Sequence, residues 1–365
     1  MKIQRYIILS ILLFLMGIVS AQSAQSDQKS KLIRDYLNEI VAQEKIPGMI
    51  AAIVSSKEII AIGSAGVRSV NSNTKLSDND LVHIGSCTKA MTAALIASLV
   101  SDGIITWETT ISAVFPELKI VIHPDFNDVT VWQLLTHRGG IPANAKNWWA
   151  YGSMNIKERR LAILKENLKN ASIQQGEYSY SNLGYMVVAT MAEKITGKPW
   201  ESLIQERLFD PLDMKSAGFG PPGNKDEIDQ PRGHIKSYGE WKPMYHDNSE
   251  ALGPAGRVHI SIEDWRKFIA IQLPGGNSLS LAREYLNRLI TPTGNYAGGW
   301  IVVERPWGKG VVFTHSGSNT MWFATVWVAP NINRAFIAVT NSSDTNSFKI
   351  SDKVIGRLIE INQQK

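Results

Sequence analysis

Apolar residues recur at helical spacing near the N-terminus and then gather in short runs. Residues 28–45 carry apolar side chains three and four positions apart, which predicts an amphipathic helix that ends before Pro47-Gly48. Two apolar runs follow at 49–54 and 59–62, and the four residues between them are typical of a turn. The N-terminal part is therefore expected to form a helix followed by a β-hairpin.

The C-terminal part contains further strand-like runs, whereas the middle of the chain follows a helical period. The runs lie at 299–303, 311–315, 324–328 and 335–339, and a closing helix is expected at 351–362. Strands at both ends with helices between them predict an α+β fold. In such a fold, one antiparallel sheet is built from the N- and C-terminal segments and is flanked by the two terminal helices, with a mainly helical region inserted.

This arrangement divides the chain into two lobes. The sheet lobe is expected to comprise residues 22–103 and 251–365, and the inserted helical lobe residues 104–250. A ligand site is expected where the lobes meet, because small molecules bind preferentially in clefts between packed units.

The first 21 residues have the composition of a secretory signal peptide. Lys2 and Arg5 precede an apolar stretch, and the small residues that end at Ala21 resemble a cleavage site, with Ala24 as the alternative. The apolar stretch is shorter than the roughly 20 residues that span a bilayer. We therefore expect a secreted or periplasmic protein that keeps no stable membrane anchor after cleavage. Cys87 is the only cysteine, so the chain has no internal disulfide.

Composition and charge narrow the class of partner. The chain has 365 residues, 44% of them hydrophobic, which is enough for a large core. Its formal net charge of +5 comes from scattered cations, and this does not favour nucleic acid as a partner. The seven histidines include no metal-binding motif, so neither a metal nor a cofactor is expected. A small molecule or a peptide remains as the expected partner.

Ser86 and Lys89 lie at the start of the most apolar helical segment. Residues 86–102 carry apolar side chains nearly all round, which predicts a buried helix that ends at Gly103. Lys89 shares a helix face with Ser86, and burial lowers the pKa of an amine, which can then accept the serine proton. Two other serines, Ser26 and Ser72, have a lysine at the same spacing but open no apolar helix. Ser86 is therefore the candidate nucleophile.

A Tyr-x-Asn sequence, Tyr180 to Asn182, precedes a predicted helix over 183–196. A phenol near an ammonium is stabilised as phenolate, so Tyr180 is a candidate proton shuttle. Asn182 offers a donor and an acceptor to an amide-like substrate. The alternative is an ordinary stretch of helix, because the same spacing occurs at Tyr36 and Tyr285.

His315 and Gly317 end the strand-like run at 311–315 and make a His-x-Gly sequence. A glycine at the end of a strand leaves room for the backbone or carboxylate of a ligand. The alternative is a structural imidazole, and His137 with Gly139 is a second occurrence of the same form.

The order of these motifs resembles the serine β-lactamase and penicillin-binding-protein superfamily. The stretches at 134–142, 180–185, 208–214 and 254–258 are also similar to recurrent family segments. The resemblance implies a covalent acyl-enzyme on Ser86, with Lys89 and Tyr180 transferring protons. It leaves open which of these two residues takes the serine proton. It also implies that the backbone N–H groups of Ser86 and Ser318 form the oxyanion hole.

His315 stands where the class C β-lactamases of this superfamily carry a lysine. A histidine is mostly neutral at neutral pH, so it attracts a substrate carboxylate less than a lysine does. The resemblance therefore implies hydrolysis of an ester or a peptide-like amide, as in D,D-peptidases and esterases. Two alternatives remain open: a class C-like β-lactamase, and an acylatable penicillin-binding or sensor protein with little turnover. A Ser-His-Asp hydrolase is disfavoured because the chain has no Gly-x-Ser-x-Gly motif.

Overall fold

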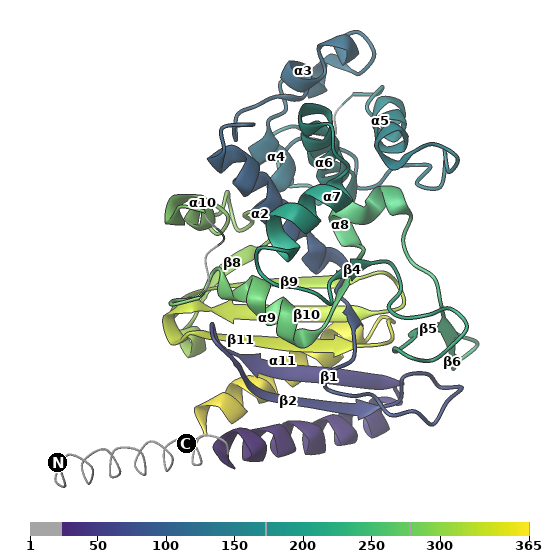
Figure 1. The fold of residues 1–365 in the computed structure, drawn as a ribbon, viewed down its shortest axis with the longest axis vertical. Coiled ribbons are helices and arrows are strands. Elements are labelled where there is room, and N and C mark those ends of the chain that lie inside the picture. Colours follow the sequence, from purple (N-terminus) through teal and green to yellow (C-terminus); the bar gives the residue numbers. More distant parts are fainter. Residues whose placement is uncertain (1–23, 172–173, 277–278, 280, 365) are drawn as a thin grey trace, which may run out of the picture.

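The computed structural model describes residues 24–171, 174–276, 279 and 281–364, and contains one large antiparallel sheet (Figure 1). Its strand order is β2-β1-β11-β10-β9-β8, so the N-terminal hairpin pairs with the last strand of the chain. The strands are β1 Gly48–Val54, β2 Ile59–Gly66, β8 Ile301–Arg305, β9 Gly310–Ser318, β10 Phe323–Ala329 and β11 Arg334–Thr340. The predicted α+β class, with a sheet assembled from both ends of the chain, is confirmed.

One face of the sheet is covered by the two terminal helices. The helix over residues 24–44 and α11, Ser347–Gln363, contribute Ile33, Leu37 and Leu358 to a core shared with alternate residues of β1 and β11. The opposite residues of the same strands, such as Ile50 and Ile337, belong to a larger core that includes the inserted helices. The sheet is therefore buried on both faces, which explains why β1 is apolar at every position rather than at alternate ones.

The remaining helices gather on the other side of the sheet (Figure 1). They are α2 Thr88–Ser101, α3 Ile111–Val114, α4 Val131–Leu135, α5 Ile156–Asn167, α6 Asn182–Thr196, α7 Trp200–Ile204, α8 Gly253–Gly256, α9 Ile262–Ala270 and α10 Arg283–Arg288. Two 3₁₀ turns precede helices of this group: η1 Gly85–Cys87 leads into α2, and η5 Glu250–Leu252 leads into α8. Helix α2 is buried from Thr88 to Leu99, which confirms the predicted buried helix.

Five short strands were not predicted from the periodicity. They form a three-stranded sheet of β3 Val82–His83, β7 Val258–Ile260 and β4 Gly218–Phe219, and a hairpin of β5 Gly233–Ser237 and β6 Glu240–Met244. Segments of two to five residues are too short to show a period.

Residues 1–21 lie outside the described residues, so the signal peptide stays a prediction, as do the lobe boundaries at 103 and 250. Of the helices described, none has the length and apolar character needed to cross a membrane.

Candidate active site

Ser86 lies where strand β9 approaches the start of helix α2. A Cβ atom on Gly317 would collide with the carbonyl oxygen of Ile84 and the backbone nitrogen of Ser86, so only glycine fits there. Gly85 has φ +48°, and a side chain at this position would strike Ser318. The two glycines let η1 and β9 pack backbone to backbone. The backbone nitrogens of Ser86 and Ser318 thus lie on either side of this contact. Their predicted role as an oxyanion hole stays a prediction.

Lys89 is completely enclosed, and its amine contacts three oxygens. Its Nζ atom donates to Ser86 Oγ at 3.1 Å, to Asn182 Oδ1 at 2.7 Å and to the carbonyl oxygen of Ala255 at 2.8 Å. None of these partners carries a negative charge. Burial therefore lowers the pKa of Lys89 well below its usual value. The neutral amine becomes accessible next to the serine hydroxyl.

Tyr180 contacts the Ser86 hydroxyl together with Lys89. Its phenol is hydrogen-bonded to Ser86, and its ring centroid lies 4.8 Å from Lys89 Nζ. Burial raises the pKa of Tyr180, and the bond to Ser86 opposes this only in part. The raised pKa disfavours the expected phenolate in the free protein, because desolvation outweighs the hydrogen bond with Ser86. Tyr180 is a protonated phenol, able to relay a proton.

Asn182, the first residue of α6, uses both ends of its amide within the protein. Its oxygen accepts from Lys89, and its NH₂ group donates to Asn144 Oδ1 at 2.9 Å. The side chain thus orients the Lys89 amine. Its predicted contact with substrate stays a prediction.

His315 is buried, and its two ring nitrogens have partners inside the protein. Nδ1 donates to the carbonyl oxygen of Ser316 at 2.7 Å, which leaves Nε2 to accept from the Tyr296 hydroxyl at 3.0 Å. Burial lowers the pKa of His315 to about 3. The imidazole is therefore neutral and fixed in one tautomer. These hydrogen bonds agree with the structural alternative. The predicted contact of His315 with a ligand stays a prediction.

Strand β9 extends beyond its outer neighbour at the site. β8 pairs with β9 only from Gly310 to Thr314, so residues 315–318 continue past it. Gly317 and Ser318 thus present the edge of a strand toward Ser86, next to the partly exposed Tyr180.

His137, which has the same His-x-Gly form as His315, holds both neighbours of Tyr180. Its carbonyl oxygen accepts from Ser179 N at 2.8 Å, and its Nδ1 accepts from Ser181 N at 3.0 Å. Its ring centroid lies 4.3 Å from that of Tyr180. Sequence reasoning missed this residue, although the similarity of the stretch at 134–142 to a family segment was a signal.

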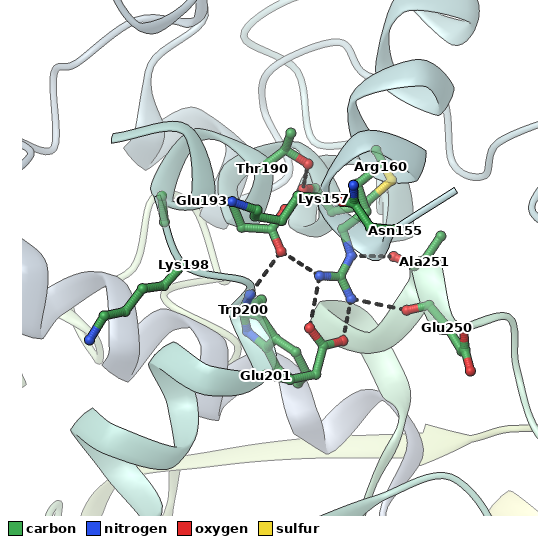
Figure 2. Close-up of polar contacts among 12 residues, drawn as sticks. Asn155, Lys157, Arg160, Thr190, Glu193, Lys198, Trp200, Glu201, Glu250 and Ala251 are labelled. Carbon is green, nitrogen blue, oxygen red and sulfur yellow. Dashed lines mark hydrogen bonds and ion pairs between the residues drawn. The ribbon is translucent and has the colours of Figure 1, made fainter. Parts of the chain in front are cut away.

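A buried arginine anchors the segment that supplies the third oxygen to Lys89. Figure 2 shows Arg160 of α5 between Glu193 of α6 and Glu201 of α7, with further bonds to the carbonyl oxygens of Glu250 and Ala251. These two carbonyls belong to η5, which leads directly into α8 and the carbonyl that faces Lys89. Arg160 thus ties three helices of the insertion to one wall of the site.

A cavity of about 380 Å³ opens beside Tyr180 and His315 and continues between β10 and the first turns of α11. Among the residues that the structure describes, no group of three or more His, Cys, Asp or Glu side chains could hold a metal ion.

Comparison with known proteins agrees with the geometry. The chain spans 64% of the unguisins hydrolase ungD of Aspergillus violaceofuscus, to which it is 25% identical over 89% of its own length. It is 23% identical to penicillin-binding protein 4 of Amycolatopsis lactamdurans, with 86% of each chain covered.

Among solved structures, the D-amino acid amidase of Ochrobactrum anthropi SV3 has a TM-score of 0.74 at 20% identity, covering 92% of this chain and 99% of that one. The penicillin-binding protein homologue of Pyrococcus abyssi has a TM-score of 0.73 at 23% identity, covering 90% and 77%. Both share the fold. The Beta-lactamase family profile matches residues 33–359. The chain therefore belongs to the Beta-lactamase family of serine hydrolases.

Proposed function

We propose that the protein hydrolyses an ester or a peptide-like amide through an acyl-enzyme on Ser86. One observation carries this proposal: the Ser86 hydroxyl lies 3.1 Å from the amine of a fully buried lysine whose three partners are uncharged oxygens. Burial favours the neutral form of such an amine, which can act as a base, whereas an exposed lysine is held as an ammonium.

The reaction proceeds in two halves. In its neutral form Lys89 Nζ keeps two N–H donors and has a lone pair, which accepts from the Ser86 hydroxyl in place of donating to it. This nitrogen takes the Ser86 proton as Oγ bonds to the substrate carbonyl carbon, and the N–H groups of Ser86 and Ser318 stabilise the oxyanion. The Tyr180 hydroxyl relays the proton to the leaving oxygen or nitrogen, which departs as an alcohol or amine. Water then attacks the acyl-serine ester, releases the acid and restores Ser86. Lys89 is the stronger candidate for first base because burial favours its neutral form and disfavours the phenolate of Tyr180.

The charges around the site favour this substrate class over β-lactams. His315 is neutral, and no lysine or arginine of the described residues lines the cavity beside it. A substrate carboxylate therefore gains no ionic partner there. We also propose that the protein is secreted or periplasmic, as the composition of residues 1–21 suggests.

Replacement of the nucleophile tests the proposal. Ser86→Ala is expected to abolish hydrolysis of short-chain p-nitrophenyl esters and D-alanyl peptides, and to abolish labelling by a fluorescent penicillin. Ser72→Ala is the matched control, because Ser72 has a lysine at the same spacing but lies on an exposed turn. Wild-type turnover by Ser86→Ala, with an unchanged circular dichroism spectrum, would refute the proposed mechanism.

The same assays separate the alternatives. Nitrocefin is expected to be a poor substrate relative to the esters. Rapid nitrocefin turnover would indicate a β-lactamase instead, and an acyl adduct that persists for hours in the intact mass spectrum would indicate a sensor.

A further inference from the structure

The cavity beside Tyr180 has aromatic walls and a single charge. Tyr178, Trp327 and Phe348 contribute large apolar surfaces, and 61% of the Phe348 side chain is exposed. Asp352, one helical turn beyond Phe348 on α11, is the only charged residue among those that line the cavity. The cavity thus combines aromatic surface with a net negative charge.

Asp352 has no ionic partner among the residues that the structure describes. The ion pairs of α11 lie elsewhere, as with Arg357 and Glu360. Arg305 lies against the Trp327 ring at 5.7 Å but does not line the cavity. His315, at the inner end, is neutral. The carboxylate of Asp352 therefore remains available to a group that enters from solvent.

The position of Tyr180 indicates which part of the substrate enters this cavity. Its phenol is hydrogen-bonded to Ser86 and also lines the cavity wall. In the mechanism above, this phenol relays the proton to the leaving group, which must therefore depart on this side of Ser86. The acyl part then lies away from Asp352.

We propose that this cavity binds the leaving group of the substrate and selects an aromatic or apolar leaving group that carries a positive charge, over one that carries a carboxylate. The inference rests on the proposed acyl-enzyme function and assigns its substrate class. Aromatic walls favour a cation through their π-faces as well as through apolar contact, and Asp352 adds the ionic attraction.

Two aryl acetates whose leaving groups carry opposite charges test this assignment. One is a phenyl acetate with a para-trimethylammonium group and the other has a para-carboxylate. The two phenols differ in intrinsic reactivity. We therefore take the ratio of kcat/KM for the cationic ester to kcat/KM for the anionic ester, and compare this ratio in each variant with the ratio in the wild type. This comparison cancels the difference in reactivity.

Asp352→Asn is expected to lower the preference for the cationic ester by about five- to tenfold. Asp352→Lys is expected to reverse the preference, so that the ratio of kcat/KM values shifts toward the anionic ester. The preference of the wild type should also fall as salt is raised, because the carboxylate is exposed to solvent. Glu360→Gln removes the same charge from the same helix outside the cavity and should leave the ratio unchanged.

An unchanged ratio in both Asp352 variants would overturn the assignment, and so would an equal change in Glu360→Gln. Either result is distinct from a failure of the proposed function, which is read from Ser86→Ala on the same two esters. A second pair of esters, with the charges on the acyl group, should respond to Asp352→Asn by less than twofold. A larger effect on the acyl pair than on the aryl pair would also overturn the leaving-group assignment.

Discussion

The amine of Lys89 has three hydrogen-bond partners in the described structure, and none of them carries a negative charge. In the described structure its amine meets the oxygens of Ser86, Asn182 and Ala255, each of which accepts a hydrogen bond without adding a negative charge. A carboxylate at any of these positions would hold the lysine as an ammonium. The same oxygens still orient the amine toward the serine. Three neutral acceptors thus combine positioning with a lowered pKa.

His137 provides a prediction at the residue scale. It acts as a positioning residue, since its carbonyl oxygen and Nδ1 hold the residues on either side of Tyr180. His137→Ala should lower kcat by about 10- to 100-fold with little change in KM, because small misplacements of a proton relay have large effects on rate.

His137→Asn should recover part of the lost kcat. An asparagine oxygen can accept from Ser181 N, and asparagine tolerates the φ of +59° found at this position. Steady-state kinetics on a p-nitrophenyl ester checks both variants, with circular dichroism to establish folding. Equal losses in the two variants would contradict the positioning role.

Part of the site is held by segments that the sequence pattern failed to predict. Helix α8 has four residues and yet supplies the carbonyl of Ala255. Strand β9 was predicted only to His315, whereas it continues to Ser318 through residues without an apolar pattern. By contrast, α2 and α6 were predicted nearly to their ends, because fourteen or fifteen residues display a period clearly.

The Arg160 network provides a prediction at the scale of elements. Arg160→Met should lower the free energy of unfolding by about 3–5 kcal/mol, because Glu193 and Glu201 would lose their common partner and Glu193 would stay buried without it. Arg357→Met is the control, since it removes an exposed ion pair with Glu360 and should cost at most about 0.5 kcal/mol. Urea titrations measure both. A loss below about 1 kcal/mol in Arg160→Met would show that the network does not tie the helices together.

At the scale of the whole molecule, burial keeps several histidines neutral in different parts of the fold. Burial lowers the pKa of each of these side chains: His137, His234, His259 and His315. In the unfolded chain each one binds a proton near pH 6.5. The unfolded state thus binds more protons than the folded state below this pH, so stability should rise with pH.

Acid should therefore destabilise the protein as the pH falls from 7 to 5. For His234, with a folded pKa of about 4, the expected loss over this interval is about 2 kcal/mol. Urea midpoints at the two pH values measure the effect. His234→Gln should show a smaller difference between pH 7 and pH 5 than the wild type, whatever its stability at pH 7. His246→Gln, which changes an exposed ring, is the control. An identical pH difference in His234→Gln and the wild type would contradict this account.

The fold class and the candidate site residues followed from the sequence alone. Long periodic segments report their own helices and strands, and the order of Ser86, Tyr180 and His315 indicated the family. The surroundings of each side chain depended on contacts between distant segments. These contacts lowered the pKa of the buried Lys89, gave both ring nitrogens of His315 partners inside the protein, turned His137 toward Tyr180, and placed Asp352 of the last helix beside the cavity that Tyr180 lines. Local sequence does not show which distant segments will contact one another, because burial and hydrogen bonding arise only when the segments pack.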